Sequence, residues 1–166
     1  MQGIFLVGFM GTGKTTIGTA LGERWGLPVY DTDEEIIKKE GISINEIFKR
    51  NGEDYFRKLE TQILKNVPVK NCIITTGGGV ILKKENREYL KSIGKVIMLN
   101  ASVEEILKRV ETDHTRPLLV GDKREKIVNL YKDRFELYIE TASIIIETTG
   151  KTVNQICEEI EQGLLN

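Results

Sequence analysis

Hydrophobic residues along the chain follow two alternating patterns. Short apolar runs rich in β-branched residues show no alternation, which is typical of strands buried on both faces of a parallel sheet. Longer segments repeat apolar positions at helical spacing, as in Ile156, Ile160 and Leu164, and these predict amphipathic helices. The runs predict strands over Ile4–Val7, Val29–Asp31, Cys72–Thr75, Val96–Leu99 and Ile144–Ile146. The segments predict helices over Lys14–Trp25, Asp33–Glu40, Ile44–Lys65 (broken at Gly52), Lys84–Ile93, Val103–Val110, Arg124–Thr141 and Thr152–Leu165.

Strands that alternate with helices predict an α/β fold, a three-layer sandwich with a five-stranded parallel sheet. A chain of 166 residues suits one domain, residues 1–166. Ligands of such sheets bind at the edge where the strands end. Three of the predicted strands are followed at that edge by residues able to do chemistry, namely 8–15, 31–33 and 76–79.

The stretch after the first strand, GFMGTGKT over residues 8–15, fits the phosphate-loop pattern G-x-x-x-x-G-K-[ST]. Its glycines let backbone N–H groups turn inward, and the following helix N-terminus adds partial positive charge. Lys14 provides a cation for the outer phosphates, and Thr15 provides a hydroxyl ligand for Mg²⁺. We therefore expect a bound nucleoside triphosphate, with contacts from Gly11, Thr12, Gly13, Lys14, Thr15 and Thr16.

Two further motifs follow strands. Asp31 and Asp33 lie two residues apart, so in extended backbone both carboxylates face one side. One would lie near the metal and the other near an acceptor hydroxyl, or one of them caps the following helix. Gly77–Gly79 costs backbone entropy, which indicates either a ligand close to the main chain or a tight turn.

For Arg57, for Arg116 and for the segment that carries Arg116, the residues alone allow both a functional and a purely structural interpretation. Arg57 and Glu60 are spaced i, i+3, which suits either a guanidinium held for carboxylate recognition or a solvated surface pair. Residues 111–126 lose apolar periodicity, which predicts a mobile lid at about 111–123 or an ordinary exposed loop. On a lid, Arg116 would bring positive charge to the transferring phosphate.

Composition narrows the function classes. The 24 basic and 25 acidic residues give a net charge of −1, which argues against nucleic acid as a partner. No apolar run reaches membrane-spanning length and no leader precedes the first strand, so we expect a cytoplasmic protein with no membrane partner. Cys72 and Cys157 are expected to be core residues, and a single histidine, His114, argues against a zinc site or a histidine triad.

Together these motifs resemble the shikimate kinase family over nearly the whole chain. The matching pieces are GFMGTGKTT (8–16), DTD (31–33), FRKLE (56–60), TTGGGV (75–80), RPLL (116–119) and DRFELYIETA (133–142). The resemblance implies a P-loop kinase fold and ATP- and Mg²⁺-dependent phosphorylation of the shikimate 3-hydroxyl, a step towards aromatic amino acids. It also implies a substrate-binding helical region at about 33–61 and a monomer.

The resemblance also implies roles for matching residues. The catalytic set would be Lys14 on the β and γ phosphates, Asp33 on the attacking hydroxyl and Arg116 on the transferring phosphate. The shikimate contacts would be Asp33, the carboxylate-gripping Arg57 and Arg134, and the backbone of Gly78 and Gly79, with Glu60 steadying Arg57. The metal site would be Thr15 and Asp31, and the adenine side would be Arg109, with Lys151 as a further candidate.

Three alternatives stay open. A gluconate or nucleoside monophosphate kinase would also use a phosphate loop, but it gives no reason for the DTD and glycine motifs together. A nucleotide-dependent switch is a different class, and the chain lacks the NKxD and D-x-x-G motifs of GTPases. A relative that binds ATP without catalysis is the third, against which the intact Lys14, Thr15, Asp33 and Arg116 argue.

Overall fold

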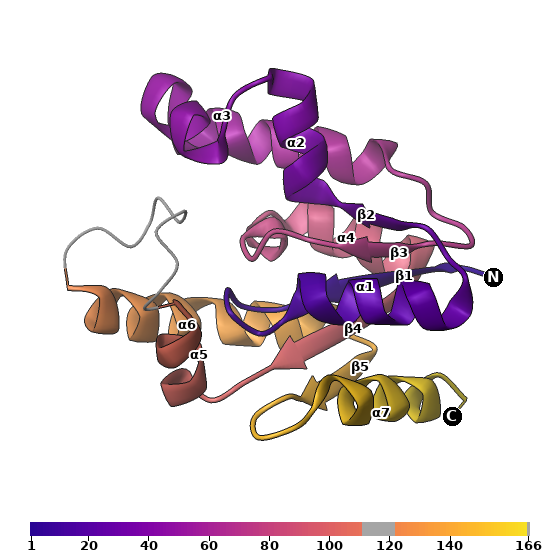
Figure 1. The fold of residues 1–166 in the computed structure, drawn as a ribbon. Helices are drawn as coiled ribbons and strands as arrows, with labels where there is room; N and C mark the ends of the chain where they lie inside the picture. The colour runs from indigo at the N-terminus through magenta and orange to yellow at the C-terminus, as the bar shows by residue number, and fades with distance from the viewer. Residues whose placement is uncertain (111–121, 166) are drawn as a thin grey trace.

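A computed structural model describes residues 1–110 and 122–165. Five strands form one parallel sheet in the order β2-β3-β1-β4-β5 (Figure 1). Their bounds are Gly3–Val7 (β1), Val29–Asp31 (β2), Ile73–Thr75 (β3), Gly94–Asn100 (β4) and Ile144–Glu147 (β5). The prediction of a five-stranded parallel α/β sheet is confirmed.

Helices cover both faces of this sheet. They are Lys14–Trp25 (α1), Thr32–Glu40 (α2), Ile44–Asn66 (α3), Lys84–Ile93 (α4), Val103–Val110 (α5), Lys123–Thr141 (α6) and Val153–Leu165 (α7), with a short 3₁₀ helix, Val80–Leu82 (η1). Gly52 interrupts α3 at φ 81° and ψ 173°, as its position in the pattern predicts. The η1 turn is too short to produce a helical period, and the sequence pattern missed it.

The central strand β1 is buried on both faces, so its side chains divide the core into two clusters. Ile4 and Leu6 pack with α1 and α7 on one face. Phe5 and Val7 pack on the other face, against residues of α3, α4, α5 and α6. Cys72 and Cys157 are free and buried, one in each cluster, as expected of core residues.

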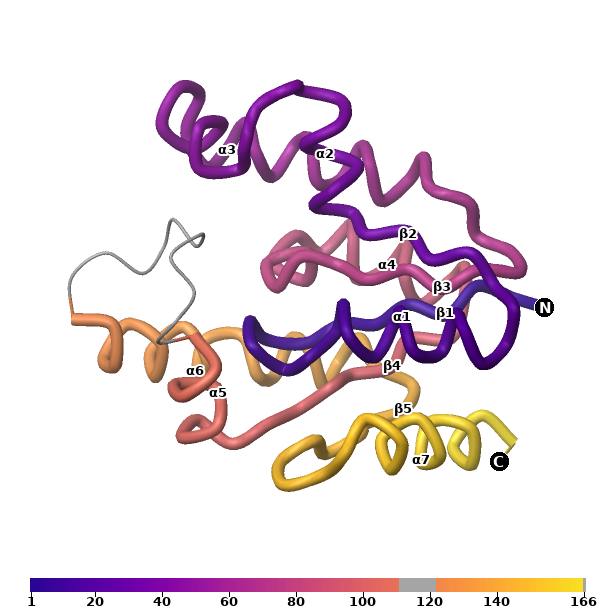
Figure 2. Tube along the Cα trace, viewed as in Figure 1, coloured from indigo at the N-terminus to yellow at the C-terminus, as the bar shows by residue number. Residues whose placement is uncertain are grey.

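The arrangement leaves the carboxyl ends of the strands accessible to ligands. The N-terminus and the end of α7 lie at the opposite ends of the strands, away from the phosphate loop and from α5 (Figure 2). Helices α2 and α3 lie together beside the edge strand β2, and α7 lies at the other end of the sheet beside β5 (Figure 1). The carboxyl ends of β1, β2 and β3 therefore open into one region bordered by α2, α3 and α6.

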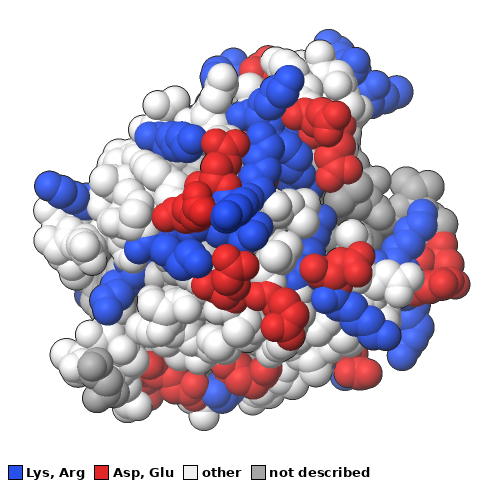
Figure 3. Space-filling view, turned by 180° about the vertical axis from the view of Figure 1, so that it is seen from behind, with Lys and Arg blue, Asp and Glu red and all other residues white. Residues whose placement is uncertain are grey.

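The surface carries charges of both signs. Lysine and arginine side chains lie among aspartate and glutamate side chains over the face seen in Figure 3. Among the described residues, no helix combines the length and the apolar character that crossing a membrane requires.

Two glycines allow α1 to approach the sheet closely. A Cβ atom on Gly18 would lie 2.4 Å from Thr75 Cγ2, and one on Gly22 would lie 2.4 Å from Val29 Cγ2. Glycine normally weakens a helix, but here the space it leaves is filled by side chains of β2 and β3.

We predict that Gly18→Ala lowers the free energy of unfolding by about 2 kcal/mol, because overpacking outweighs the better helix propensity of alanine. Thr19→Ala, at an exposed neighbouring position of the same helix, is the matched control and leaves this free energy nearly unchanged. Urea denaturation measures both. A Gly18→Ala protein more stable than wild type would contradict the close packing.

Candidate active site

The phosphate loop, residues 8–15, joins β1 to α1 and forms one wall of a cavity. This phosphate-loop cavity is lined by Gly11, Gly13, Lys14, Thr15, Thr16, Asp31, Asp33, Thr76, Gly77, Gly78 and Arg109. Lys14 Nζ donates to the carbonyls of Gly8 (2.8 Å) and Phe9 (2.9 Å), so the lysine is held against its own loop. Thr12, by contrast, is buried and its hydroxyl donates to Phe9 O, so its side chain braces the loop.

Asp31 connects three elements at this edge. Its Oδ1 accepts from the backbone N–H of Asp33 (2.9 Å) and Glu34 (3.3 Å), which caps α2. Its Oδ2 accepts from Thr75 Oγ1 (2.7 Å) and Thr15 Oγ1 (3.3 Å). Capping and proximity to the phosphate loop therefore coexist in one carboxylate.

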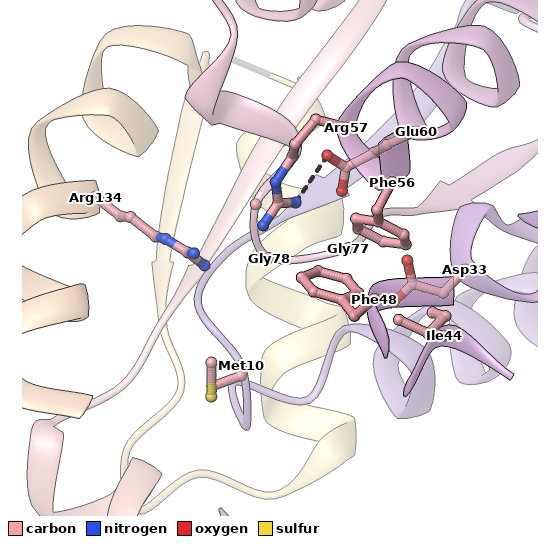
Figure 4. Close-up of a pocket in the computed structure, with 11 residues that line it drawn as sticks. Met10, Asp33, Ile44, Phe48, Phe56, Arg57, Glu60, Gly77, Gly78 and Arg134 are labelled. Atoms are coloured by element: carbon pink, nitrogen blue, oxygen red, sulfur yellow. Dashed lines mark hydrogen bonds and ion pairs between the residues drawn. The ribbon is translucent and has the colours of Figure 1, made fainter. Parts of the chain in front are cut away.

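A second cavity, here called the arginine cavity, adjoins the first (Figure 4). It is lined by Met10, Asp33, Ile44, Phe48, Phe56, Arg57, Glu60, Gly77, Gly78, Gly79 and Arg134. Asp33, Gly77 and Gly78 line both cavities. A carboxylate and a glycine turn thus form the boundary across which a group on one ligand can reach the other.

Arg57 lies inside the protein and is held by two carboxylates. Only 8% of the residue is exposed, which excludes a solvated surface pair. Its Nη1 donates to Glu60 Oε2 at 2.9 Å, and its Nε and Nη2 donate to Glu53 Oε1 at 3.3 and 3.2 Å. The sequence analysis missed Glu53, although its i, i+4 spacing from Arg57 on α3 is the signal for such a pair.

Two of the three glycines after β3 are explained by side chains of the site. A Cβ atom on Gly79 would lie 2.1 Å from Arg57 Nη1, and one on Gly77 would lie 2.7 Å from Asp33 Oδ1. No residue with a side chain leaves room for both the guanidinium and the carboxylate. The close approach inferred from the glycine triplet is therefore made, at these two positions, by the protein itself.

Arg134 reaches the same cavity from α6, across from Arg57 (Figure 4). The residue is 3% exposed, and its guanidinium carbon lies 6.0 Å from the centre of the Phe9 ring. Two guanidinium groups thus face a small space that also contains the carboxylates of Asp33 and Glu60. The arrangement suits a small ligand that carries both a carboxylate and hydroxyl groups.

Burial shifts the titration of Glu60. Loss of solvent raises the pKa of this carboxyl, the charge of Asp33 adds to the rise, and the resulting pKa is about 7. The charges of Arg57 and Arg134 and the hydrogen bond from Arg57 act in the opposite direction, but burial outweighs them.

The remaining predicted site residues are Arg109, Lys151 and Arg116. Arg109 lines the phosphate-loop cavity, donates to Gly11 O at 2.9 Å and pairs with Glu105. Lys151 lies in the loop after β5, pairs with Glu159 at 2.7 Å and is not among the residues lining either cavity. Arg116, His114 and most of the predicted lid fall within 111–121, outside the described residues.

The comparisons with known proteins agree with this geometry. The family model described as shikimate kinase matches residues 10–164. The chain belongs to the shikimate kinase family. A protein of Enterococcus faecalis named shikimate kinase is 42% identical over 166 residues, 99% of each chain.

Solved structures place the chain in the same family. A shikimate kinase from Acinetobacter baumannii, determined in complex with shikimate, has a TM-score of 0.96 at 40% identity, over 99% of this chain and 93% of that one. A gluconokinase from Sinorhizobium meliloti has a TM-score of 0.58 at 19% identity, over 98% and 91% of the chains, and shares only the fold.

The raised pKa of Glu60 predicts a pH-dependent stability. The unfolded chain releases this proton near the ordinary pKa of 4.5, whereas the folded protein keeps it to about 7. The stabilisation is therefore complete below the lower value and is lost as the pH rises through the upper one. Between about pH 5 and pH 8, Glu60→Gln should gain about 2 kcal/mol of unfolding free energy relative to wild type.

Urea denaturation at a series of pH values measures this difference. Glu53→Gln is the matched control, because that carboxylate also pairs with Arg57 but its side chain is 48% exposed. The control should follow the wild-type pH profile. A difference between Glu60→Gln and wild type that stays constant with pH would contradict the assigned titration.

Proposed function

We propose that this chain transfers the γ-phosphoryl group of ATP to the 3-hydroxyl of shikimate, and that the residues of the two cavities perform this transfer. The observation that carries the proposal is the shared boundary of Asp33, Gly77 and Gly78 between a phosphate-loop cavity and an arginine cavity. A nucleotide in the first and an acceptor in the second would meet at Asp33. This is the requirement for direct, in-line phosphoryl transfer.

On the nucleotide side, the phosphate loop and the start of α1 would bind the triphosphate. Backbone N–H groups of the loop and the N-terminus of α1 would provide positive potential without a mobile charge. Lys14 would leave its present carbonyl acceptors at Gly8 and Phe9 and neutralise the outer phosphates. Arg109 would border the adenine, and Lys151 is a further candidate on that side.

The donor set at the loop fits a magnesium ion. Thr15 and Asp31 place a hydroxyl and a carboxylate oxygen 3.3 Å apart at the start of α1. Among the described residues, no group of three or more acidic, histidine or cysteine side chains forms a ligand cage. Mg²⁺ is characteristically bound by one or two protein oxygens together with substrate phosphates and water. Thr15 and Asp31 would hold this ion, which would supply positive charge against the negative charge of the phosphates.

On the acceptor side, Asp33 would orient the attacking hydroxyl and accept its proton. Asp33 is the carboxylate at the boundary of both cavities, and the cap formed by Asp31 holds its backbone N–H in place. Arg57 and Arg134 would hold the substrate carboxylate, with Gly78 and Gly79 offering backbone contacts. Arg116, known here from sequence alone, would provide the remaining positive charge at the transferred group.

The wall of the arginine cavity favours shikimate over gluconate. Ile44, Phe48 and Phe56 add apolar surface to this cavity, and the Phe56 ring lies beside Arg57, with the guanidinium carbon 5.2 Å from the ring centre (Figure 4). A cyclohexene ring offers apolar carbon to such a wall, whereas the hydroxylated chain of gluconate would leave its hydroxyl groups without partners there.

We also propose that the chain is one domain that works as a cytoplasmic monomer on these two small molecules. The support is that described residues of a single chain line both cavities. The helical region at about 33–61 would act as the acceptor-binding part and the segment at about 111–123 as a lid.

The deciding experiment is ADP release from ATP and Mg²⁺ with shikimate, gluconate, a nucleoside monophosphate panel or no acceptor. We expect turnover with shikimate, and a fall of about 100-fold or more in Asp33→Asn because the proton acceptor is lost. Asp54→Asn, an exposed aspartate on α3, is the control and keeps wild-type turnover. Turnover with only another acceptor would overturn the assigned substrate.

A second prediction concerns the two arginines. Arg57→Lys and Arg134→Lys keep the positive charge but lose the planar fork, so the KM for shikimate should rise about tenfold or more. The KM for ATP should stay within about twofold, because neither arginine lines the phosphate-loop cavity. Arg50→Lys is the matched control, since Arg50 lies on the exposed side of α3 and pairs with Glu46. An equal rise in both KM values would contradict the assigned carboxylate site.

A further inference from the structure

Tyr138 is a buried polar residue to which neither the family motifs nor the proposed reaction assigns a role. It lies one helical turn after Arg134 on α6, and it is 1% exposed. Its hydroxyl donates a hydrogen bond to the carbonyl of Gly78. The side chain therefore connects α6, which carries one of the two cavity arginines, to the glycine turn between the cavities.

This hydrogen bond determines how the Gly78–Gly79 peptide is turned. The described chain contains no cis peptide bonds, so the Gly78 carbonyl and the Gly79 N–H point in opposite directions. With the carbonyl held by Tyr138, the Gly79 N–H faces away from α6. Gly77 N–H donates to Thr32 Oγ1, whereas the N–H groups of Gly78 and Gly79 have no acceptor within the described part of the chain.

The turn has neighbours on two sides. A Cβ atom on Gly78 would lie 3.5 Å from Met10 N and 3.6 Å from both Gly8 O and Tyr138 Oη, so the turn is packed between the phosphate loop and α6. Burial raises the pKa of Tyr138 well above its ordinary value, while the nearby charge of Arg134 lowers it. The hydroxyl stays protonated and remains a donor.

We propose that Tyr138 is a positioning residue for the acceptor: its hydroxyl fixes the Gly78–Gly79 peptide so that the Gly79 N–H faces the arginine cavity. The glycines cannot hold this orientation themselves, because they have the least restricted backbone of all residues. The bond also ties the turn to the helix that presents Arg134, so the two acceptor contacts keep one relative position. This proposal rests on the proposed function, since it concerns binding of the same acceptor.

The test compares Tyr138→Phe with Tyr131→Phe in the full-length protein. Tyr131 lies on the same helix, and its hydroxyl donates to Asn100 Oδ1 at 2.9 Å, so each variant loses one hydroxyl and keeps its ring. Steady-state assays give the KM for shikimate and for ATP, calorimetry gives the Kd for shikimate, and urea denaturation reports stability. For Tyr138→Phe we expect the KM and Kd for shikimate to rise about tenfold, with the KM for ATP within about twofold.

The outcomes separate this role from a purely structural one. Tyr131→Phe should keep wild-type constants for both substrates, whatever its effect on stability. The positioning role would be overturned, and the proposed function left intact, if Tyr138→Phe kept the wild-type KM and Kd for shikimate. Equal rises in the KM for shikimate and the KM for ATP would have the same meaning. So would a rise in the KM for shikimate in Tyr131→Phe as large as that in Tyr138→Phe. A wild-type protein without shikimate-dependent turnover would overturn the proposed function itself, and this inference with it.

Discussion

The carboxylate of Asp31 is the interaction on which the geometry of the site depends. It caps α2 through the N–H groups of Asp33 and Glu34, and it accepts hydroxyls from Thr75 on β3 and Thr15 on α1. One side chain therefore fixes the relative positions of the phosphate loop, the glycine turn after β3 and the helix that carries Asp33. A neutral or shorter side chain cannot serve all four donors, because only a carboxylate has enough acceptor sites.

Burial of charge is the second constraint. Arg57 and Glu60 are almost completely enclosed, and removing charges from water is costly unless they are paired and hydrogen bonded. The glycines at 77 and 79 leave the space in which Arg57 and Asp33 can lie without displacing the main chain. Gly79 and the buried arginine are thus two parts of one arrangement, since a side chain at this position would overlap the guanidinium of Arg57.

The fold and much of the site could be predicted from the sequence because their signals are local. The apolar runs predicted the strands, and the glycine-rich loop before Lys14 predicted the position of the phosphate-binding site. The i, i+3 spacing identified Arg57 with Glu60, but their burial depends on how α3 packs against the glycine turn, which no local pattern contains. The role of Tyr138 could not be predicted for the same reason. A tyrosine on the apolar face of a helix is interpreted as a core residue, and the sequence does not show that its hydroxyl donates to the Gly78 carbonyl.

Selectivity for the acceptor follows from how these charges are arranged. The pKa of Glu60 is raised to about 7, which weakens the negative charge that this residue places beside Arg57 and Arg134 near neutral pH. A ligand carboxylate would give the two arginines a further ionic partner, whereas an uncharged ligand of the same shape would displace water from them without providing one. The apolar side chains of Ile44, Phe48 and Phe56 add a second requirement. They contact a carbon ring favourably, whereas hydroxyl groups buried against them lose hydrogen bonds to water and weaken binding. Discrimination between ligands therefore has two sources. One is the set of contacts that the correct ligand makes, and the other is the set of charged and hydroxyl groups that a wrong ligand leaves without partners.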